Sequence, residues 1–347
     1  MKILLTADPE LPVPPIHYGG IERIIHLLAD GLVERGHDVT LIAHAQSRTR
    51  AKLIPYAATD WRSISGRIAN TALVSTTIAR GRHSFDLVHS HCRLAYLAPV
   101  LPLRVPTLMS YQRKVTPRSI VWSRRLSRQS IEFSAVSHDM TRDVAHLAPW
   151  HVVYNGVPLT KFDYRSSVAA NAPLVFLGRI EPIKGTHVAI QAARRAGLPL
   201  VIAGNVPDDQ KGYFERDIAP HVDGVMVSYI GPVDDERKNE LLGKASAFLM
   251  PILWDEPFGI VMAEAMACGT PVIGFRRGSV GEVVAHGVTG FACSDEDEMV
   301  AAIARIGEID RKACRLRAET MFSETTVVED FLRIYRKLSH PETSGLE

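Results

Sequence analysis

Short apolar runs alternate with segments of helical periodicity along almost the whole chain. One helix face is formed by Ile21, Ile24, Ile25, Leu28 and Leu32, and an apolar run flanks this segment on each side. Apolar runs in which polar residues do not alternate are typical of strands buried on both faces of a parallel sheet. The repeated alternation of strand and helix therefore predicts a doubly wound parallel sheet, which belongs to the α/β class.

The alternation is interrupted at residues 158–173, where small and polar residues replace the apolar periodicity. This composition predicts a linker, because such a segment has no apolar face to bury. A chain of 347 residues is also long enough for two domains. We therefore expect one domain over residues 1–160, a second over residues 161–325, and a closing helix over residues 326–340.

The composition argues against several classes of protein. The chain has 40 Lys and Arg residues against 38 Asp and Glu residues, and a net charge of +2 does not favour a protein built to bind nucleic acid. No apolar run is long enough for a transmembrane helix, and the first apolar run is too short for a signal peptide. The four cysteines are scattered without a C-x-x-C motif, which indicates free thiols in a reducing compartment. We therefore expect a cytoplasmic protein.

Residues 249–275 carry the strongest candidate chemistry. Two apolar runs, predicted as buried strands, are joined by a loop rich in Pro and Gly and by a helix that begins near Gly259. Glu256 lies in the loop and Glu264 on the helix. Open α/β sheets bind ligands at the carboxyl ends of their strands, and a helix N-terminus attracts anions. Two carboxylates beside such a helix end suit a nucleotide-sugar, which has hydroxyl groups at both ends and phosphate between them.

Two further loops carry groups suited to phosphate. Gly19 and Gly20 stand between a predicted strand and a helix, where the backbone can approach a ligand closely. Arg179 and Lys184 share one short loop after another predicted strand, and two such cations can hold a diphosphate. Each feature alone is also compatible with an ordinary turn or a solvated basic loop. The sequence offers no credible set of metal ligands, so we expect these cations and helix N-termini to stabilise a phosphate leaving group without a metal.

These motifs together resemble those of the retaining glycosyltransferases of family 4, which have the GT-B fold. The segment EPFGIVMAE matches their E-x7-E motif, GGIE matches G-G-x-E, and GRIEPIKG matches G-R-x-x-x-x-K-G. The resemblance implies two Rossmann-like domains that face a cleft, and a last helix that crosses back to the first domain. We expect this crossing in residues 326–340, where Phe331 and Tyr335 are one turn apart.

The resemblance also implies roles for individual residues. In the family, the first Glu and the Phe-Gly backbone after it contact the donor sugar, the second Glu binds ribose, and the Arg, Lys and Gly-Gly groups hold the diphosphate. His91 matches a histidine that contacts the donor sugar and the acceptor, whereas His89 is more typical of a packed structural residue. The expected catalytic residues are His91, Arg179, Lys184 and Glu256. The expected donor-binding residues, with the base near Gly204 and Val233, are Gly19, Gly20, Arg179, Lys184, Gly204, Val233, Glu256, Phe258, Gly259, Ile260 and Glu264.

The predicted function is the transfer of a hexose from a nucleotide-sugar of the UDP-glucose type to an acceptor that the sequence does not identify. The resemblance implies a retaining reaction, and we expect neither a metal nor a cofactor. Two alternatives stay open, namely a sugar-nucleotide epimerase of the same fold and a non-catalytic sugar-nucleotide-binding protein. The sequence departs from the family at Tyr111 and Gln112, where a histidine often stands, so the acceptor chemistry is not carried over at that point.

A basic span marks the expected acceptor side. Residues 87–131 contain no acidic residue but eight Arg and Lys residues. A helix predicted in this span carries Trp122 and Leu126 toward one side and basic residues on the other, namely Arg124, Arg125 and Arg128. One interpretation is a solvated basic face over the core of the domain. The other is a surface that meets an anionic acceptor, or the anionic headgroups of a membrane that the chain contacts peripherally.

Overall fold

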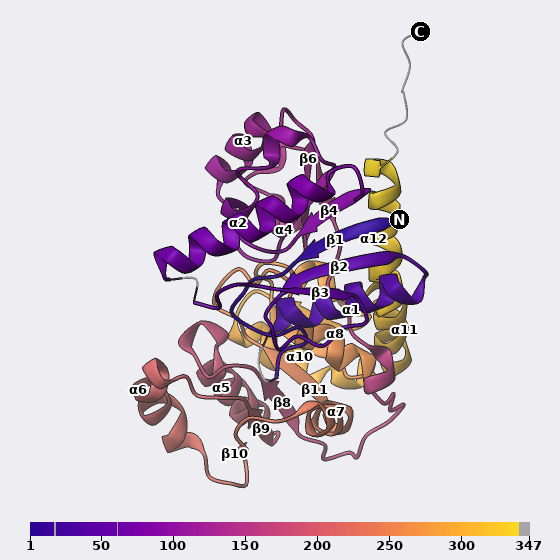
Figure 1. Cartoon of the computed structure of the whole chain (residues 1–347). Coiled ribbons are helices and arrows are strands. Elements are labelled where there is room, and N and C mark those ends of the chain that lie inside the picture. Colours follow the sequence, from indigo (N-terminus) through magenta and orange to yellow (C-terminus); the bar gives the residue numbers. More distant parts are fainter. Residues whose placement is uncertain (17–18, 61, 340–347) are drawn as a thin grey trace. The chain divides into compact units, whose positions relative to one another are not determined.

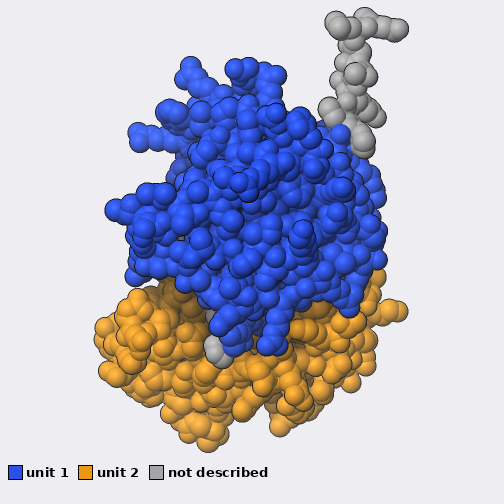
Figure 2. Space-filling model, in the orientation of Figure 1, with its two compact units in different colours: residues 1–155, 324–347 blue, residues 156–323 orange. Residues whose placement is uncertain are grey.

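The computed structural model describes residues 1–16, 19–60 and 62–339, and the chain forms two compact units (Figure 1). The first unit consists of Met1–Asn155 together with the C-terminal segment that begins at Glu324, and the second unit is Gly156–Ser323 (Figure 2). Each unit contains its own parallel sheet. The prediction of two doubly wound parallel sheets is therefore confirmed.

The sheet of the first unit has seven parallel strands in the order β3-β2-β1-β4-β5-β6-β7. The strand order reverses between β1 and β4, and ligands of open α/β sheets bind at such a switch point. The strands are β1 (Lys2–Thr6), β2 (Asp38–Ala43), β3 (Lys52–Pro55), β4 (Leu87–Ser90), β5 (Thr107–Tyr111), β6 (Ile131–Ala135) and β7 (Trp150–Val152). The helices are α1 (Gly20–Glu34), α2 (Ile64–Gly81), α3 (Pro117–Leu126), α4 (His138–Thr141) and α12 (Glu324–Ser339), with short 3-10 turns η1 (Leu94–Tyr96), η2 (Leu101–Leu103) and η3 (Ala145–Leu147).

Burial on both faces explains why β1 is apolar at successive positions. Ile3 and Leu5 join a core that α1 and α12 complete, whereas Leu4 joins the core on the other face, which includes residues of α2 and α3. Figure 1 shows these helices on the two sides of the sheet. Because successive side chains of a strand point to opposite faces, a strand covered on both faces needs an apolar residue at each position.

The C-terminal helix α12 packs on α1 within the first unit, as predicted for the closing helix. Its buried face includes Val328, Phe331 and Tyr335, which recur at helical spacing. An ion pair between Arg35 Nε and Glu329 Oε1, 2.8 Å apart, adds a polar contact at the margin of this packing. Residue 340, the last of the predicted helix, lies outside the described residues.

The sheet of the second unit has six parallel strands in the order β10-β9-β8-β11-β12-β13. The strands are β8 (Leu174–Leu177), β9 (Leu200–Ala203), β10 (Val227–Tyr229), β11 (Ala247–Met250), β12 (Val272–Phe275) and β13 (Gly290–Cys293). The helices are α5 (Thr186–Ala196), α6 (Lys211–Tyr213), α7 (Asp235–Lys244), α8 (Ile260–Ala267), α9 (Val280–Val283), α10 (Glu296–Ala304) and α11 (Arg311–Met321). Short turns of helix are η4 (Leu159–Lys161), η5 (Pro182–Lys184), η6 (Asp208–Gln210), the π-helical η7 (Phe214–Ile218), η8 (Ala219–His221) and η9 (Ile306–Glu308).

Residues 158–173, for which composition predicts a linker, lie within the second unit and pack on it. Phe162 is buried, and its carbonyl oxygen accepts a hydrogen bond of 2.9 Å from Arg315 Nη1. The backbone N–H of Arg165 donates to the carbonyl oxygen of Cys268, 3.1 Å away. Backbone hydrogen bonds such as these leave no periodic apolar signal in the sequence, so the composition does not predict that the segment packs on the unit.

Helix α3 differs from its predicted amphipathic pattern. Its inward face consists of Ile120 and Ser123, and Trp122 and Leu126 are exposed rather than packed on the domain core. Arg124 turns back toward the fold, where its Nη1 donates to the carbonyl oxygen of Leu147 at 2.6 Å. The side of the helix that carries Trp122 and Leu126 therefore faces solvent, and Ile120 and Ser123 make the contact with the core.

Candidate active site

The loop after β11 holds Glu256 against a lysine. Lys184 Nζ lies 2.6 Å from Glu256 Oε2, and the same oxygen accepts a hydrogen bond of 3.0 Å from the indole N–H of Trp254. Lys184 belongs to η5, which follows β8, and β8 and β11 are neighbours in the sheet. The backbone N–H of Ser279 fixes the loop from the other side by donating to the carbonyl oxygen of Glu256 at 2.9 Å. A carboxylate and a cation are thus held together at the carboxyl edge of the sheet, although they are far apart in sequence.

The start of helix α8 is shaped by Gly259. This residue has φ of +72°, in the left-handed region, and an added Cβ would lie 2.7 Å from Met250 Cε, so only glycine fits without strain. Phe258 before it is buried, and its carbonyl oxygen accepts a 2.9 Å hydrogen bond from Ser279 Oγ. Ile260 begins the helix, whose first backbone N–H groups precede the regular hydrogen-bond ladder. The helix N-terminus therefore offers an anion site next to Glu256 in the sequence.

Glu264 forms a second carboxylate–lysine pair. Its side chain is buried on α8, with 6% of the residue exposed, and Lys238 Nζ lies 2.5 Å from Glu264 Oε1. Lys238 is on α7, where it also lies 3.4 Å from Asp235 Oδ1 and above the ring of Phe162. Lys238 is not among the site residues predicted from the sequence, because nothing in the composition of α7 distinguishes it from the other charged residues there. Both expected glutamates are therefore held by lysines rather than solvated.

Arg179 lies two residues beyond the end of β8, on the same loop as Lys184. Its Nε is 2.5 Å from Glu181 Oε1, and its side chain is partly exposed. Each of the two expected phosphate-binding cations is thus paired with a carboxylate of its own. A bound diphosphate would compete with Glu181 and Glu256 for them.

The expected contacts of the base lie at the ends of β9 and β10. Gly204, directly after β9, has φ of +146°, and an added Cβ would lie 1.7 Å from the carbonyl oxygen of Gly178. The N–H of Gly204 donates to the carbonyl oxygen of Gly231 at 2.9 Å, and the hydroxyl of Tyr229 donates to the carbonyl oxygen of Gly204 at 2.8 Å. Val233 is partly exposed on the loop that leads to α7. These bonds give this edge of the second unit a fixed backbone surface.

In the first unit, Gly19 and Gly20 lie at the start of α1, and residues 17 and 18 before them are outside the described residues. Gly19 precedes the helix, and its carbonyl oxygen accepts a 3.3 Å hydrogen bond from the N–H of Arg23. Glu22 in the first turn is buried, and burial raises the pKa of its carboxyl group above the usual value. The partial positive charge of the helix N-terminus favours an anion at this place.

His91 follows β4 at the switch point of the first sheet. It is 7% exposed, and neither ring nitrogen has a hydrogen-bond partner among the described residues. Burial lowers the pKa of His91 to about 3, so its imidazole is neutral near pH 7. A neutral imidazole offers one N–H donor and one acceptor to a hydroxyl group.

His89 is a packed structural histidine, as expected. Its Nδ1 lies 2.5 Å from Tyr335 Oη on α12, and its Nε2 lies 2.6 Å from Ser110 Oγ on β5. The rings of His89 and His91 are 4.2 Å apart between centroids, and Phe331 packs against His89. The C-terminal helix therefore supports the strand end from which His91 projects.

Two further features, a metal site and a membrane-spanning helix, were sought among the described residues. Across residues 1–16, 19–60 and 62–339, no group of three or more His, Cys, Asp or Glu side chains is arranged to hold a metal ion. Within the same ranges, no helix is long and apolar enough to cross a membrane.

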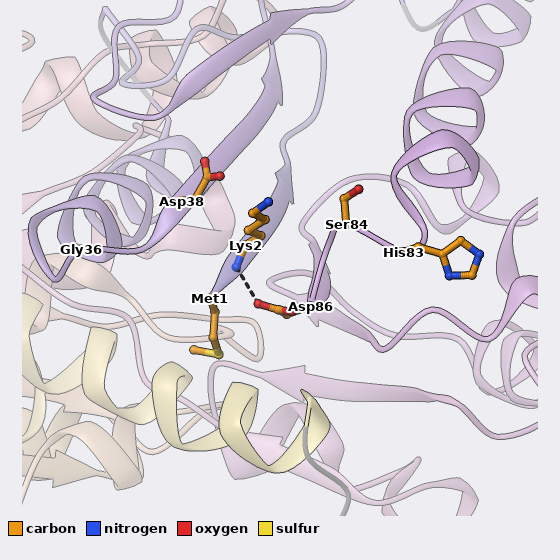
Figure 3. A pocket seen from close by; sticks show the side chains of 7 residues that line it. All are labelled: Met1, Lys2, Gly36, Asp38, His83, Ser84 and Asp86. Atoms are coloured by element: carbon orange, nitrogen blue, oxygen red, sulfur yellow. Dashed lines mark hydrogen bonds between the residues drawn. The ribbon is translucent and has the colours of Figure 1, made fainter.

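A surface pocket also occurs at the opposite, amino-end edge of the first sheet (Figure 3). It is lined by Met1, Lys2, Gly36, Asp38, His83, Ser84 and Asp86. The backbone N–H of Lys2 donates to Asp86 Oδ2 at 2.8 Å, so part of the polar lining is already engaged. Because parallel sheets bind ligands at their carboxyl ends, we do not assign the active site to this pocket.

The architecture and the site residues define the class of protein. Two parallel-sheet units, the C-terminal helix in the first unit, and the residues around α8 are those of a GT-B glycosyltransferase. The family model of glycosyltransferase family 4 matches residues 18–161, and that of the glycosyl transferases group 1 matches residues 168–320. YtcC of Bacillus subtilis (strain 168), whose name describes a glycosyltransferase, is 30% identical over 99% of this chain and 93% of its own. The chain belongs to the family 4 glycosyltransferases.

Solved structures agree with this assignment. AviGT4, a glycosyltransferase involved in avilamycin A biosynthesis, is 27% identical in sequence to this chain. The two structures superimpose with a TM-score of 0.72 over 98% of each chain. Anabaena HepE, in complex with UDP-glucose, has a TM-score of 0.72 over 97% of this chain and 100% of its own, at 18% identity, and so has the same fold. These similarities confirm the predicted GT-B fold and give no support to the epimerase alternative.

Proposed function

We propose that this glycosyltransferase transfers a hexose from a UDP-glucose-type donor, with retention of anomeric configuration and without a metal ion. The observation that carries the proposal is the pair of lysine-bound carboxylates, Lys184–Glu256 and Lys238–Glu264, on either side of the start of α8. Such a site offers anionic acceptors for hydroxyl groups at two points and cationic and backbone donors between them. A nucleotide-sugar requires that arrangement of donors and acceptors.

In the proposed donor complex, Glu264 binds the ribose hydroxyls and Glu256 binds the sugar, together with the backbone of Phe258, Gly259 and Ile260. The base rests on the backbone near Gly204 and Val233, which fits the fixed surface described for that edge. HepE, which has the same fold, is known in complex with UDP-glucose, and this supports uridine as the nucleoside.

The diphosphate is assigned to Arg179 and Lys184, and to the helix N-terminus at Gly19 and Gly20. Breaking the anomeric C–O bond leaves a nucleoside diphosphate on which negative charge grows, so groups that bind it more tightly in the transition state accelerate the reaction. Lys184 is already held by Glu256, and its Nζ lies 5.1 Å from the centroid of the Trp254 ring. A cation held in this way needs little reorganisation as the charge develops.

His91 is assigned to the sugar and to the acceptor hydroxyl. Its neutral imidazole can hydrogen-bond a hydroxyl group without adding charge near the anomeric centre. Retention rests on membership of the family and on the matched E-x7-E motif.

A donor panel tests this function. Thermal shift of the full chain with UDP-, GDP- and ADP-sugars should show the largest stabilisation with UDP-glucose or a close relative, by the linkage of ligand binding to stability. Proton NMR of an incubation with the best donor should then show an α-configured product from an α-configured donor, and EDTA should not change the rate. An isomerised donor sugar would favour an epimerase, and tight binding without hydrolysis or transfer to any acceptor would favour a non-catalytic protein.

A further inference from the structure

The outward face of α3 combines an exposed tryptophan with exposed arginines. Trp122 is 65% exposed, Val121 48% and Leu126 37%, and Arg118 and Arg125 are also exposed. At 100° per residue these five positions fall within one arc of the helix, opposite the buried Ile120 and Ser123. We call these five residues the α3 face. The α3 face therefore combines basic and apolar side chains, and its apolar residues are not packed in the core.

The neighbouring turn extends the α3 face. Turn η2 packs beside α3, and it presents Leu103 and Arg104, both exposed. Arg104, which directly follows η2, has φ of +58°, and this left-handed conformation ends the turn of helix. The same combination of one apolar and one basic side chain therefore continues beyond the helix.

The stretch of sequence that contains α3 and η2 carries charge of one sign. Residues 87–131, which include α3 and η2, contain eight Arg and Lys residues and no acidic residue, so no side chain of this span neutralises the arginines of the α3 face. Arg124 is the exception among the arginines of α3, because it is bound to the carbonyl oxygen of Leu147 and to Gln129. A positive surface of this kind attracts an anionic partner.

We propose that the α3 face docks on the surface of an anionic lipid bilayer. Arginines bind the headgroups, while Trp122, Val121 and Leu126 enter the boundary between headgroups and acyl chains, as interfacial helices do. A soluble anionic acceptor would account for the arginines but not for three exposed apolar side chains beside them. A second copy of the chain is disfavoured, because a symmetric contact would set two equally charged faces against each other.

The docking is a property of the first unit and does not depend on the donor chemistry proposed above. Its effect would be to bring the enzyme to a surface that carries lipid-linked or anionic molecules. If the donor assignment fails, the docking proposal is unaffected, and if the docking proposal fails, the donor assignment is unaffected.

Vesicle binding by the full chain tests the proposal. Cosedimentation with vesicles of phosphatidylcholine alone, and of phosphatidylcholine with phosphatidylglycerol, should show binding only to the anionic vesicles. The double variant Arg118→Gln, Arg125→Gln should bind roughly 25-fold more weakly, at about fivefold per charge near the surface. Trp122→Ala should weaken binding and abolish the vesicle-induced blue shift of tryptophan emission, which a Trp150→Phe variant should retain.

A matched control lies on α2 of the same unit. Arg67 and Arg80 are exposed there, and Ile68 is 65% exposed, as Trp122 is. The double variant Arg67→Gln, Arg80→Gln and the single variant Ile68→Ala should bind anionic vesicles like the wild type. Circular dichroism melts show which variants are folded. If Trp122→Ala does not fold, the double variant Arg118→Gln, Arg125→Gln still tests the proposal.

Four results would overturn the proposal. These are no binding of the wild type to anionic vesicles, equal binding to both vesicle types, equal losses in the α2 and α3 double variants, and a dimer in size-exclusion chromatography that Trp122→Ala dissociates. Loss of vesicle binding in the presence of millimolar inorganic phosphate at constant ionic strength would instead assign the arginines to a soluble phosphorylated ligand.

Discussion

Replacement of Glu264 tests the ribose assignment directly. Glu264→Gln keeps the shape of the side chain but removes its charge, so each bound ribose hydroxyl loses a charge-assisted hydrogen bond. Such a bond contributes roughly 1.5–3 kcal/mol, and 1.4 kcal/mol corresponds to a tenfold change in affinity. The amide oxygen of Gln still accepts a neutral hydrogen bond, which contributes roughly 0.5–1.5 kcal/mol. The expected loss is the difference of about 1–1.5 kcal/mol, so free UDP should bind roughly 5- to 12-fold more weakly. The intact donor should lose the same factor, because both ligands contain the ribose.

The lysine partner adds a separate effect on stability. Lys238 Nζ lies 2.5 Å from Glu264 Oε1, and both side chains are largely buried. Breaking a buried ion pair from one side costs about 3–5 kcal/mol when the remaining charge has no other partner. Lys238 keeps Asp235 at 3.4 Å, so we expect Glu264→Gln to lower the free energy of unfolding by less than about 3 kcal/mol.

Calorimetric titration with UDP separates the two effects when Lys238→Met is measured beside Glu264→Gln. Both variants break the same ion pair, but only Glu264→Gln removes the proposed acceptor of the ribose hydroxyls. Urea unfolding should show a loss of stability in both variants, whereas UDP affinity should fall much further in Glu264→Gln. Equal losses of UDP affinity in the two variants, or an unchanged affinity in Glu264→Gln, would refute the ribose assignment.

Three other predictions concern the phosphate site, the backbone and pH. Lys184→Ala should lower kcat by a larger factor than it raises the Kd of the donor, because charge grows in the transition state, and activity lost to EDTA and restored by manganese would contradict the metal-free site. Gly204→Ala should destabilise the fold by more than about 3 kcal/mol in urea unfolding, because it adds a Cβ 1.7 Å from a carbonyl oxygen at positive φ, whereas Gly212→Ala, with open space around its Cβ, should be tolerated. The pKa of His91 is about 3 when folded and near 6.5 when unfolded, so its contribution to stability is complete above pH 6.5 and declines by up to about 1.4 kcal/mol per unit as the pH falls toward 3. His91→Gln should reduce the pH dependence of the unfolding free energy by that slope, and an identical slope in both proteins would show that His91 is not buried as described.

The fold, and the places of the two glutamates on a loop and a helix, could be predicted from the sequence because their signals are local. Glu256, Gly259 and Glu264 lie within one strand–loop–helix segment, where apolar periodicity and a glycine determine the geometry. The partners of the glutamates leave no such signal, since Lys184 is 72 residues from Glu256 and Lys238 is 26 residues from Glu264. These pairs form only when the strands and helices of the second unit pack.

The buried face of α3 could not be predicted from the sequence for a related reason. Helical spacing places Trp122 and Leu126 on one side of the helix but does not show whether that side is buried, and in the structure Ile120 and Ser123 occupy the inward face. The inward positions of a helix are decided by the space that the adjacent elements leave. A sequence pattern predicts the inward positions only when apolar residues recur at regular helical spacing, and in residues 117–126 they do not.

In the proposed donor complex, the two lysine–carboxylate pairs connect recognition of the donor with its chemistry. Without a donor, each of these partly or largely buried charges has a partner of opposite sign, which avoids the cost of an unpaired buried charge. A donor that approaches Glu256 with sugar hydroxyls and Lys184 with phosphate draws the two partners toward different parts of one molecule. As the anomeric bond breaks, the phosphate gains charge and competes more strongly for Lys184, while Glu256 becomes a freer anion beside a sugar that gains positive character. One ion pair can therefore stabilise both halves of a separating charge, and this gives a physical reason for joining a clamp lysine to the sugar-binding carboxylate.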